Sequence, residues 1–267
     1  MSRVVVLQQA EAFGPGRLVP VFRDFGIRMD VRRLYAGDEC PSDLDEMRAL
    51  VVLGGPMQVS DVGNATMPYL AREFDLLKRA VVADRSTLAI GFGAELLAHA
   101  AGAKVHPNAK PGATPEAPAI PMPEFGWGPV NYPFPGGTEP IVLGMHDGMS
   151  VFHWHSDTFD LPRLPAPTNA PPPPAPPPPT GNALLCSSKT CKNQAFRFKN
   201  RLFGFQWHPE LTPELIDGII AANPNVVQTL GSDAAAKIRQ ETEKNYPQYT
   251  RLGDKLLRNF VQFLKVY

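Results

Sequence analysis

The sequence predicts an α/β fold, in which a mostly parallel sheet carries helices on both faces and has a small antiparallel extension. Short apolar runs rich in β-branched residues alternate with segments of helical periodicity, the pattern of strands that are buried on both faces and joined by crossover helices. Of the 267 residues, 43% are hydrophobic, which is enough to bury a large core. Alternating residues in the last two strand candidates, 195–198 and 202–206, indicate the antiparallel extension.

The first half of the chain has the clearest periodicity. In the segment Met67–Ala83, the apolar residues Leu70, Phe74, Leu77 and Val81 recur at spacings of three and four, which predicts an amphipathic helix. The predicted strands of this half are Arg3–Gln8, Ile27–Leu34, Ala49–Leu53 and Ser86–Ile90, and the other predicted helices are Gly16–Phe25 and Ala94–Ala101.

The second half is less regular, and proline, with 30 residues in the chain, is most concentrated there. Residues 106–123 are rich in Pro and Ala and indicate a surface loop. Residues 164–180 contain PPPPAPPPP, which favours extended polyproline II, so we expect a disordered insertion within a single domain spanning 1–267. The remaining predictions are strands at Ile141–Leu143, Ser150–His153, Ala183–Cys186, Ala195–Phe198 and Leu202–Gln206, and a closing helix over Ala234–Tyr267.

Composition excludes several classes of protein. Lys+Arg and Asp+Glu both number 26, so the balanced charge predicts neither nucleic-acid nor membrane binding. The three cysteines, Cys40, Cys186 and Cys191, are too few and too irregular for a disulfide framework. The short apolar run at the N-terminus does not resemble a signal peptide, and no run approaches the length of a membrane span. We therefore expect a cytoplasmic protein without a cofactor.

A strand, a glycine-rich turn and a helix follow one another in LAIGFGAELLAHAAGAKV (88–105). Such a turn often carries a nucleophile, because its strained backbone projects the side chain and the helix N-terminus offers N–H groups to an oxyanion. Here the turn is Ile90-Gly91-Phe92, which contains no Ser, Cys or Thr. A simple glycine-tolerant turn is the alternative interpretation.

Two further segments carry possible catalytic groups. FGFQWHPE (203–210) ends a strand at His208 and places Glu210 two residues later, which is the base-and-orienter half of a Cys-His-Glu triad. VLGGPMQVSD (52–61) has paired glycines after a buried strand, which can bring backbone N–H groups close to a ligand. A structural histidine and a simple tight turn remain the alternatives.

A fourth segment, FHWHSDTFDLP (152–162), is dense in polar and aromatic groups. Its two histidines, His153 and His155, could suggest a metal site. We expect them to point to opposite faces of a strand, and we therefore predict no metal.

In this order, these segments resemble the class I glutamine amidotransferase family, particularly free-standing proteins similar to the amidotransferase subunit of GMP synthase. The resemblance covers nearly the whole chain and implies that family's flavodoxin-like fold. The family's oxyanion loop is similar to VVLGGPMQVSD, and its strand after the elbow helix is similar to PEFGWGPV (123–130). Its later motifs are similar to HWHSDTFDLP, LLCSSKTCKNQAFRF (184–198) and GFQWHPE. Its closing helix is similar to RLGDKLLRNFVQFL.

The resemblance assigns a role to each candidate residue. The family's elbow carries a nucleophilic cysteine where this chain has Gly91, and a pocket glutamine where it has Glu95. The other two triad positions correspond to His208 and Glu210. The oxyanion-stabilising N–H groups correspond to those of Gly55 and Phe92.

The missing cysteine bears directly on mechanism. In the family, a thiolate attacks the side-chain amide of glutamine, forms a glutamyl thioester and releases ammonia, and a glycine closes that covalent route. At Glu95, a charged carboxylate would repel the ligand's own carboxylate, or the side chain must become protonated. We therefore expect a pseudoenzyme whose pocket is no longer maintained for glutamine.

Alternatives remain open for function and for partners. An active amidase could use His208 and Glu210 with water or with an unrecognised nucleophile. A one-base difference separates Cys and Gly codons, so resequencing tests whether Gly91 is a sequence error. A non-catalytic protein would bind glutamine, a related small molecule, a synthetase or another copy of itself. The proline-rich residues 165–179 could bind a protein that reads polyproline II, although an inert spacer is favoured.

Overall fold

A seven-stranded sheet forms the centre of the protein in the computed structural model, which describes residues 3–45, 47–114, 117–164 and 181–266. The strand order is β11-β12-β13-β4-β3-β1-β2, and neighbours from β13 to β2 pair in parallel, whereas β12 and β11 are antiparallel. This confirms the mostly parallel sheet and its antiparallel extension. The strands are β1 (Arg3–Gln8), β2 (Met29–Arg33), β3 (Met47–Val52), β4 (Thr87–Ile90), β11 (Asn182–Cys186), β12 (Ala195–Phe198) and β13 (Leu202–Phe205).

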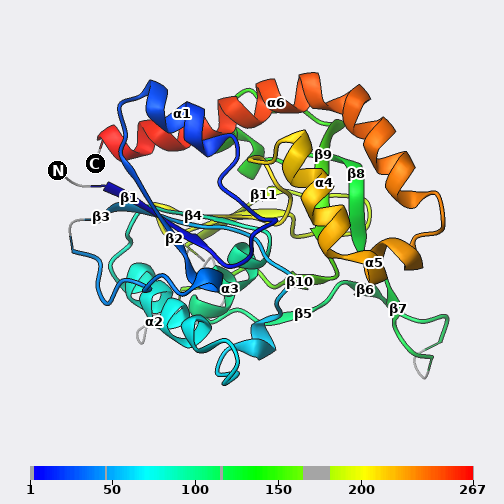
Figure 1. Cartoon of the computed structure of the whole chain (residues 1–267), viewed down its shortest axis with the longest axis horizontal. Helices are drawn as coiled ribbons and strands as arrows, with labels where there is room; N and C mark the ends of the chain where they lie inside the picture. The colour runs from blue at the N-terminus through cyan, green and yellow to red at the C-terminus, as the bar shows by residue number, and fades with distance from the viewer. Residues whose placement is uncertain (1–2, 46, 115–116, 165–180, 267) are drawn as a thin grey trace, which may run out of the picture.

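Helices cover both faces of the sheet (Figure 1). On one face lie α1 (Leu18–Asp24) and the long α6 (Ala234–Val266), and on the other lie α2 (Pro68–Val82) and α3 (Phe92–Ala100). Side chains of β1 alternate between two separate cores: Val4 and Val6 pack with residues of α1 and α6, whereas Val5 and Leu7 pack with residues of α2 and α3. The continuous apolar run in β1 is explained by this burial on both faces.

Three short antiparallel pairs and two further helices extend from the sheet. The longest pair joins β8 (Glu124–Val130) to β9 (Met149–His155) along their whole length. The other pairs are β5 (Val105–Pro107) with β10 (Asp157–Phe159), and β6 (Ala109–Lys110) with β7 (Ile120–Pro121). The helices α4 (Pro213–Ala222) and α5 (Pro224–Thr229) contact α6. Short 3-10 turns occur at Leu34–Ala36 (η1), Val59–Asp61 (η2), Gly136–Thr138 (η3) and Pro140–Val142 (η4).

Three local predictions are wrong. Residues 106–123 are not simply a loop, since they contribute to β5, β6 and β7. The strand predicted at Ile141–Leu143 is instead the 3-10 turn η4, where Pro140 takes the first position and the apolar Ile141 and Val142 are buried near α6. The apolar run therefore reflects packing, not strand formation. Helix α3 begins at Phe92, two residues before the predicted start.

The proline-rich insertion lies, apart from Leu164, outside the described residues. Within the described ranges, no helix combines the length and the apolar character needed to cross a membrane.

Candidate active site

The candidate site lies where neighbouring parallel strands end. Because β13, β4 and β3 are parallel neighbours, their carboxyl ends meet at one edge of the sheet, which is where open α/β sheets bind ligands. Beyond β3 lie Gly54 and Gly55, beyond β4 lies Gly91, and beyond β13 the chain continues to His208. The structure thus brings together the glycine loop, the elbow and the histidine that the sequence singled out separately.

His208 and Glu210 form a buried pair. The Nδ1 atom of His208 lies 2.9 Å from Oε1 of Glu210, and both residues are fully buried. A carboxylate can only accept a hydrogen bond, so this contact places a proton on Nδ1 and leaves Nε2 to act as a base or as a second donor. Nε2 is buried and has no hydrogen-bond partner.

Gly91 faces that free nitrogen. Its backbone has φ +56° and ψ −126°, a conformation that side-chain-bearing residues rarely adopt. A Cβ atom built at Gly91 would lie 3.0 Å from His208 Nε2 and 2.9 Å from Cε1. Any side chain at this position would therefore point directly at the imidazole.

Gly54 covers the same imidazole from the loop after β3. A Cβ atom on Gly54 would lie only 2.7 Å from His208 Cε1, closer than such atoms approach without displacement. Glycine at this position leaves room for the histidine ring, and sequence reasoning assigned no role to it. The Gly54-Gly55 pair was visible in the sequence, but only the packing shows that the His208 ring needs a glycine at position 54.

A small cavity of about 120 Å³ opens beside the elbow. Its wall includes Gly55 and Phe92, the two predicted oxyanion residues, together with Glu95. Phe125 and Trp154 add aromatic surface, with ring centroids 5.1 Å apart. A larger depression of about 640 Å³ lies nearby and is lined by none of the predicted site residues. Gly91, His208 and Glu210 do not line the smaller cavity either.

Glu95 is only 5% exposed, and its carboxyl group accepts a hydrogen bond of 2.7 Å from Nε2 of Gln206. Burial raises the pKa of Glu95 to about 8, and nearby Asp157 raises it further, whereas Gln206 opposes the shift. At pH 7 the group is therefore mostly protonated and uncharged. A neutral Glu95 offers one O–H donor and an acceptor oxygen and carries no charge, so it would not repel a carboxylate in this cavity.

A second buried carboxyl group, which the sequence analysis did not single out, supports the glycine loop. Gln9 donates a hydrogen bond to Glu73 on α2, and Cβ of Gln9 lies 3.5 Å from the position of a Cβ atom on Gly55. Burial raises the pKa of Glu73 to about 8. This contact fixes the end of β1 against α2 beneath the loop.

The three cysteines are poorly suited to act as nucleophiles. Cys186 and Cys191 are buried and Cys40 is half-buried. Burial raises the pKa of Cys191 to about 11 and that of Cys40 to about 12, so both stay protonated at neutral pH. The Sγ atom of Cys191 contacts the Thr158 hydroxyl at 3.2 Å and the backbone oxygen of Asn193 at 3.7 Å, whereas Nε2 of His208 has no hydrogen-bond partner.

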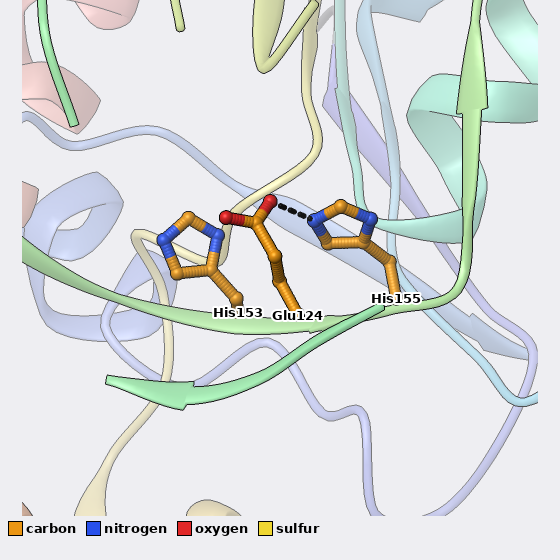
Figure 2. Close-up of side chains that lie close together, drawn as sticks. All are labelled: Glu124, His153 and His155. Carbon is orange, nitrogen blue, oxygen red and sulfur yellow. Dashed lines mark ion pairs between the residues drawn. The ribbon is translucent and has the colours of Figure 1, made fainter. Parts of the chain in front are cut away.

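The two histidines of β9 lie on the same side of the strand, which contradicts our expectation. Residues two apart on a strand share a face, so the expectation was geometrically wrong. Figure 2 shows the carboxylate of Glu124 between the rings of His153 and His155. All three side chains offer a ligand atom, and these atoms lie within 4.8 Å of one another.

Glu124 is also the centre of a hydrogen-bond network. It accepts hydrogen bonds from Ser188, Thr190 and Gln194. Burial by itself would raise the pKa of Glu124, but the contact with His155, the electrostatic effect of His153 and the Thr190 hydrogen bond lower it to about 2. The network joins β8, β9 and the segment before β12. The motifs that contain these residues were singled out in the sequence, but no role was predicted for Glu124.

Comparison with known proteins agrees with this geometry. The model of the family "Glutamine amidotransferase class-I" matches residues 17–224. The glutamine amidotransferase-like protein YfeJ of Salmonella typhimurium is 28% identical over 239 residues, covering 88% of this chain and 86% of its own.

Solved structures share the fold. A glutamine amidotransferase from Thermotoga maritima has a TM-score of 0.74 at 23% identity, covering 99% of this chain and 98% of its own. One from Methylobacillus flagellatus has a TM-score of 0.77 at 22% identity, covering 98% and 95%. The family match spans most of the chain, and the sheet and the edge site agree with it. The chain belongs to the class I glutamine amidotransferase family.

Proposed function

We propose that this protein is a non-catalytic member of its family, which binds a ligand at the elbow cavity and does not hydrolyse glutamine. The observation that carries the proposal is Gly91: the elbow position nearest His208 Nε2 bears no side chain. Without a thiolate there is no thioester, and removing the nucleophile of a triad typically costs several orders of magnitude in rate.

The cavity supports binding of glutamine or a related small molecule. Gly55 and Phe92 line it, and the protonated Glu95 presents a donor and an acceptor to a neutral amide. Ionisation of Glu95 above about pH 8 removes the donor and adds a negative charge. Glutamine affinity is therefore expected to fall between pH 7 and pH 9 in isothermal calorimetry, and Glu95→Gln is expected to abolish that fall.

Association with a synthetase or with a polyproline-reading protein is a further part of the proposal. The proline-rich residues that would mediate the second contact lie outside the described residues. Ligand binding at the elbow does not depend on either partner.

The decisive experiment compares glutamate release from glutamine by the native chain, by Gly91→Cys and by Gly91→Ala. In Gly91→Cys the new thiol faces His208, so this variant alone is expected to release glutamate and to be labelled by an electrophilic glutamine analogue. Gly91→Ala introduces the same backbone strain without a thiol and serves as the matched control. Turnover by the native chain well above background would contradict the proposal.

One observation favours a second function, hydrolysis by activated water. The His208–Glu210 pair is intact, and Nε2 of His208 is free and directed at the space above Gly91. A water molecule there could lose a proton to Nε2 as it attacks the amide. Under this alternative, native turnover would be measurable and His208→Asn would abolish it, whereas under our proposal both proteins are inactive.

A further inference from the structure

We propose that Glu124, His153 and His155 form a binding site for one divalent transition-metal ion beside the elbow cavity. These residues belong to β8 and β9, and the site is independent of the triad remnant. Two imidazoles and one carboxylate are a donor set that suits zinc and its neighbours in the first transition series.

The contacts of His155 show which of its ring nitrogens is available to a metal ion. Its Nδ1 lies 2.9 Å from the backbone oxygen of Asp157, which can only accept, so Nδ1 carries the proton. Its Nε2 lies 3.1 Å from Oε2 of Glu124. Nε2 of Gln194 lies 3.4 Å from the same ring nitrogen and donates to the same carboxylate oxygen. A metal ion that displaced Gln194 would therefore lie between Nε2 of His155 and Oε2 of Glu124.

The distance between those two atoms suits a metal. Ligand atoms about 2.0–2.1 Å from a tetrahedral zinc ion lie roughly 3.3 Å from each other. The separation of 3.1 Å between Nε2 of His155 and Oε2 of Glu124 is close to this value. The hydrogen bond from Nδ1 of His155 to the backbone oxygen of Asp157 is also of the type that orients metal-binding imidazoles.

His153 supplies the independent observation. Its side chain is 2% exposed, and neither ring nitrogen makes a well-formed hydrogen bond, although the backbone of Gly128 lies close enough to interact with the ring. Leaving a buried imidazole without a partner is unfavourable. Figure 2 shows its ring beside the Glu124 carboxylate, on the side opposite His155. A metal ion between these side chains would give His153 the partner that it lacks in the structure.

The neighbours of Glu124 are compatible with metal binding. Ser188 donates to Oε1 at 2.7 Å, and Thr190 donates to the same oxygen. These bonds orient the carboxylate while Oε2 faces His155, as outer partners of metal-bound carboxylates do. Gln194, which donates to Oε2, is the group that an ion would displace. His155 also lines the elbow cavity, which provides an entry path.

The test uses the full chain, freed of metal by chelator dialysis, and zinc chloride as the probe. Calorimetry is expected to show one zinc ion per chain. His153→Gln and Glu124→Gln are each expected to weaken binding by more than about tenfold. The matched control is His146→Gln, which changes an exposed histidine outside the cluster and is expected to leave affinity unchanged.

A second measurement keeps the proposal falsifiable if a variant fails to fold. Cobalt(II) bound to the native chain is expected to give the visible absorption of a tetrahedral nitrogen–oxygen site, without a thiolate charge-transfer band. Three outcomes would each overturn the proposal: no stoichiometric binding, a thiolate band, or affinity that is unchanged in folded His153→Gln.

Discussion

At the scale of single residues, the site places a glycine at the elbow beside a buried histidine and glutamate. Gly91 occupies the elbow with φ +56°, a conformation that costs glycine little and other residues of the order of 1–3 kcal/mol. His208 and Glu210 nevertheless keep a well-formed hydrogen bond of 2.9 Å. A single substitution at Gly91 therefore tests what this intact His208–Glu210 pair can do.

The buried Glu95 makes stability depend on pH. Its pKa is raised from 4.5 to about 8, chiefly by burial, so the folded protein binds this proton more tightly than the unfolded chain does. The contribution to stability is complete below about pH 4.5 and is lost as the pH rises towards 8. Glu95→Gln cannot ionise, so it is expected to become more stable than the native chain by roughly a few kcal/mol as the pH rises from 5.5 to 8.5.

Urea unfolding at those two pH values measures the difference. The matched control is Glu243→Gln, which changes an exposed carboxylate on α6 and should show the same pH dependence as the native chain. An identical pH dependence in Glu95→Gln and the native chain would mean that Glu95 is ionised at neutral pH. The charge-repulsion argument against glutamine would then apply again.

At the scale of elements, α6 supports the segment that carries His208 and Leu211. The hydroxyl of Tyr249 donates to the backbone oxygen of His208 at 2.5 Å and accepts from the N–H of Leu211 at 3.1 Å. Tyr249→Phe leaves two buried backbone groups without this partner and is expected to lower the free energy of unfolding by about 1–3 kcal/mol. Tyr246→Phe, on the same helix but half-buried, is the control, and equal losses in urea unfolding would contradict this role.

Helix α3 packs closely against the end of β3, and a glycine makes this possible. A Cβ atom on Gly93 would lie 2.4 Å from the Val52 backbone oxygen, whereas one on Gly218 in α4 would meet its nearest atom at 3.9 Å. Gly93→Ala must therefore move the elbow helix and is expected to cost more than about 2 kcal/mol. Gly218→Ala is expected to gain about 0.5–1 kcal/mol from helix propensity. Thermal unfolding compares the two, and a stabilised Gly93→Ala would contradict the close packing.

The elements also show what sequence could and could not predict. The first-half strands and helices were predicted nearly to their ends, because strands buried on both faces, such as β1, leave a strong apolar signal. The turn at 140–142 was mistaken for a strand, since a short apolar run reports burial and not backbone conformation. The network around Glu124 joins residues 64–70 positions apart, and periodicity carries no information about such contacts.

At the scale of the whole molecule, the sheet separates two apolar cores. One core contains residues of α1 and α6, and the other contains residues of α2 and α3. The edge site lies above both, with His208 bonded to α6 through Tyr249 and with the elbow at the start of α3. The geometry of the site therefore depends on how firmly the C-terminal helix packs on the sheet.

Leu256 tests that dependence, because it is a fully buried residue of α6 in the first core. Leu256→Ala is expected to lower the free energy of unfolding by about 2–5 kcal/mol, since it removes buried methyl groups and leaves a cavity. Leu143→Ala makes the same chemical change where the side chain is 64% exposed, and its effect should stay within about 0.5 kcal/mol. Urea unfolding with an unchanged m-value is the measurement. Equal, small effects at both positions would mean that α6 does not pack on the sheet in solution, and the support that it gives to His208 would be absent as well.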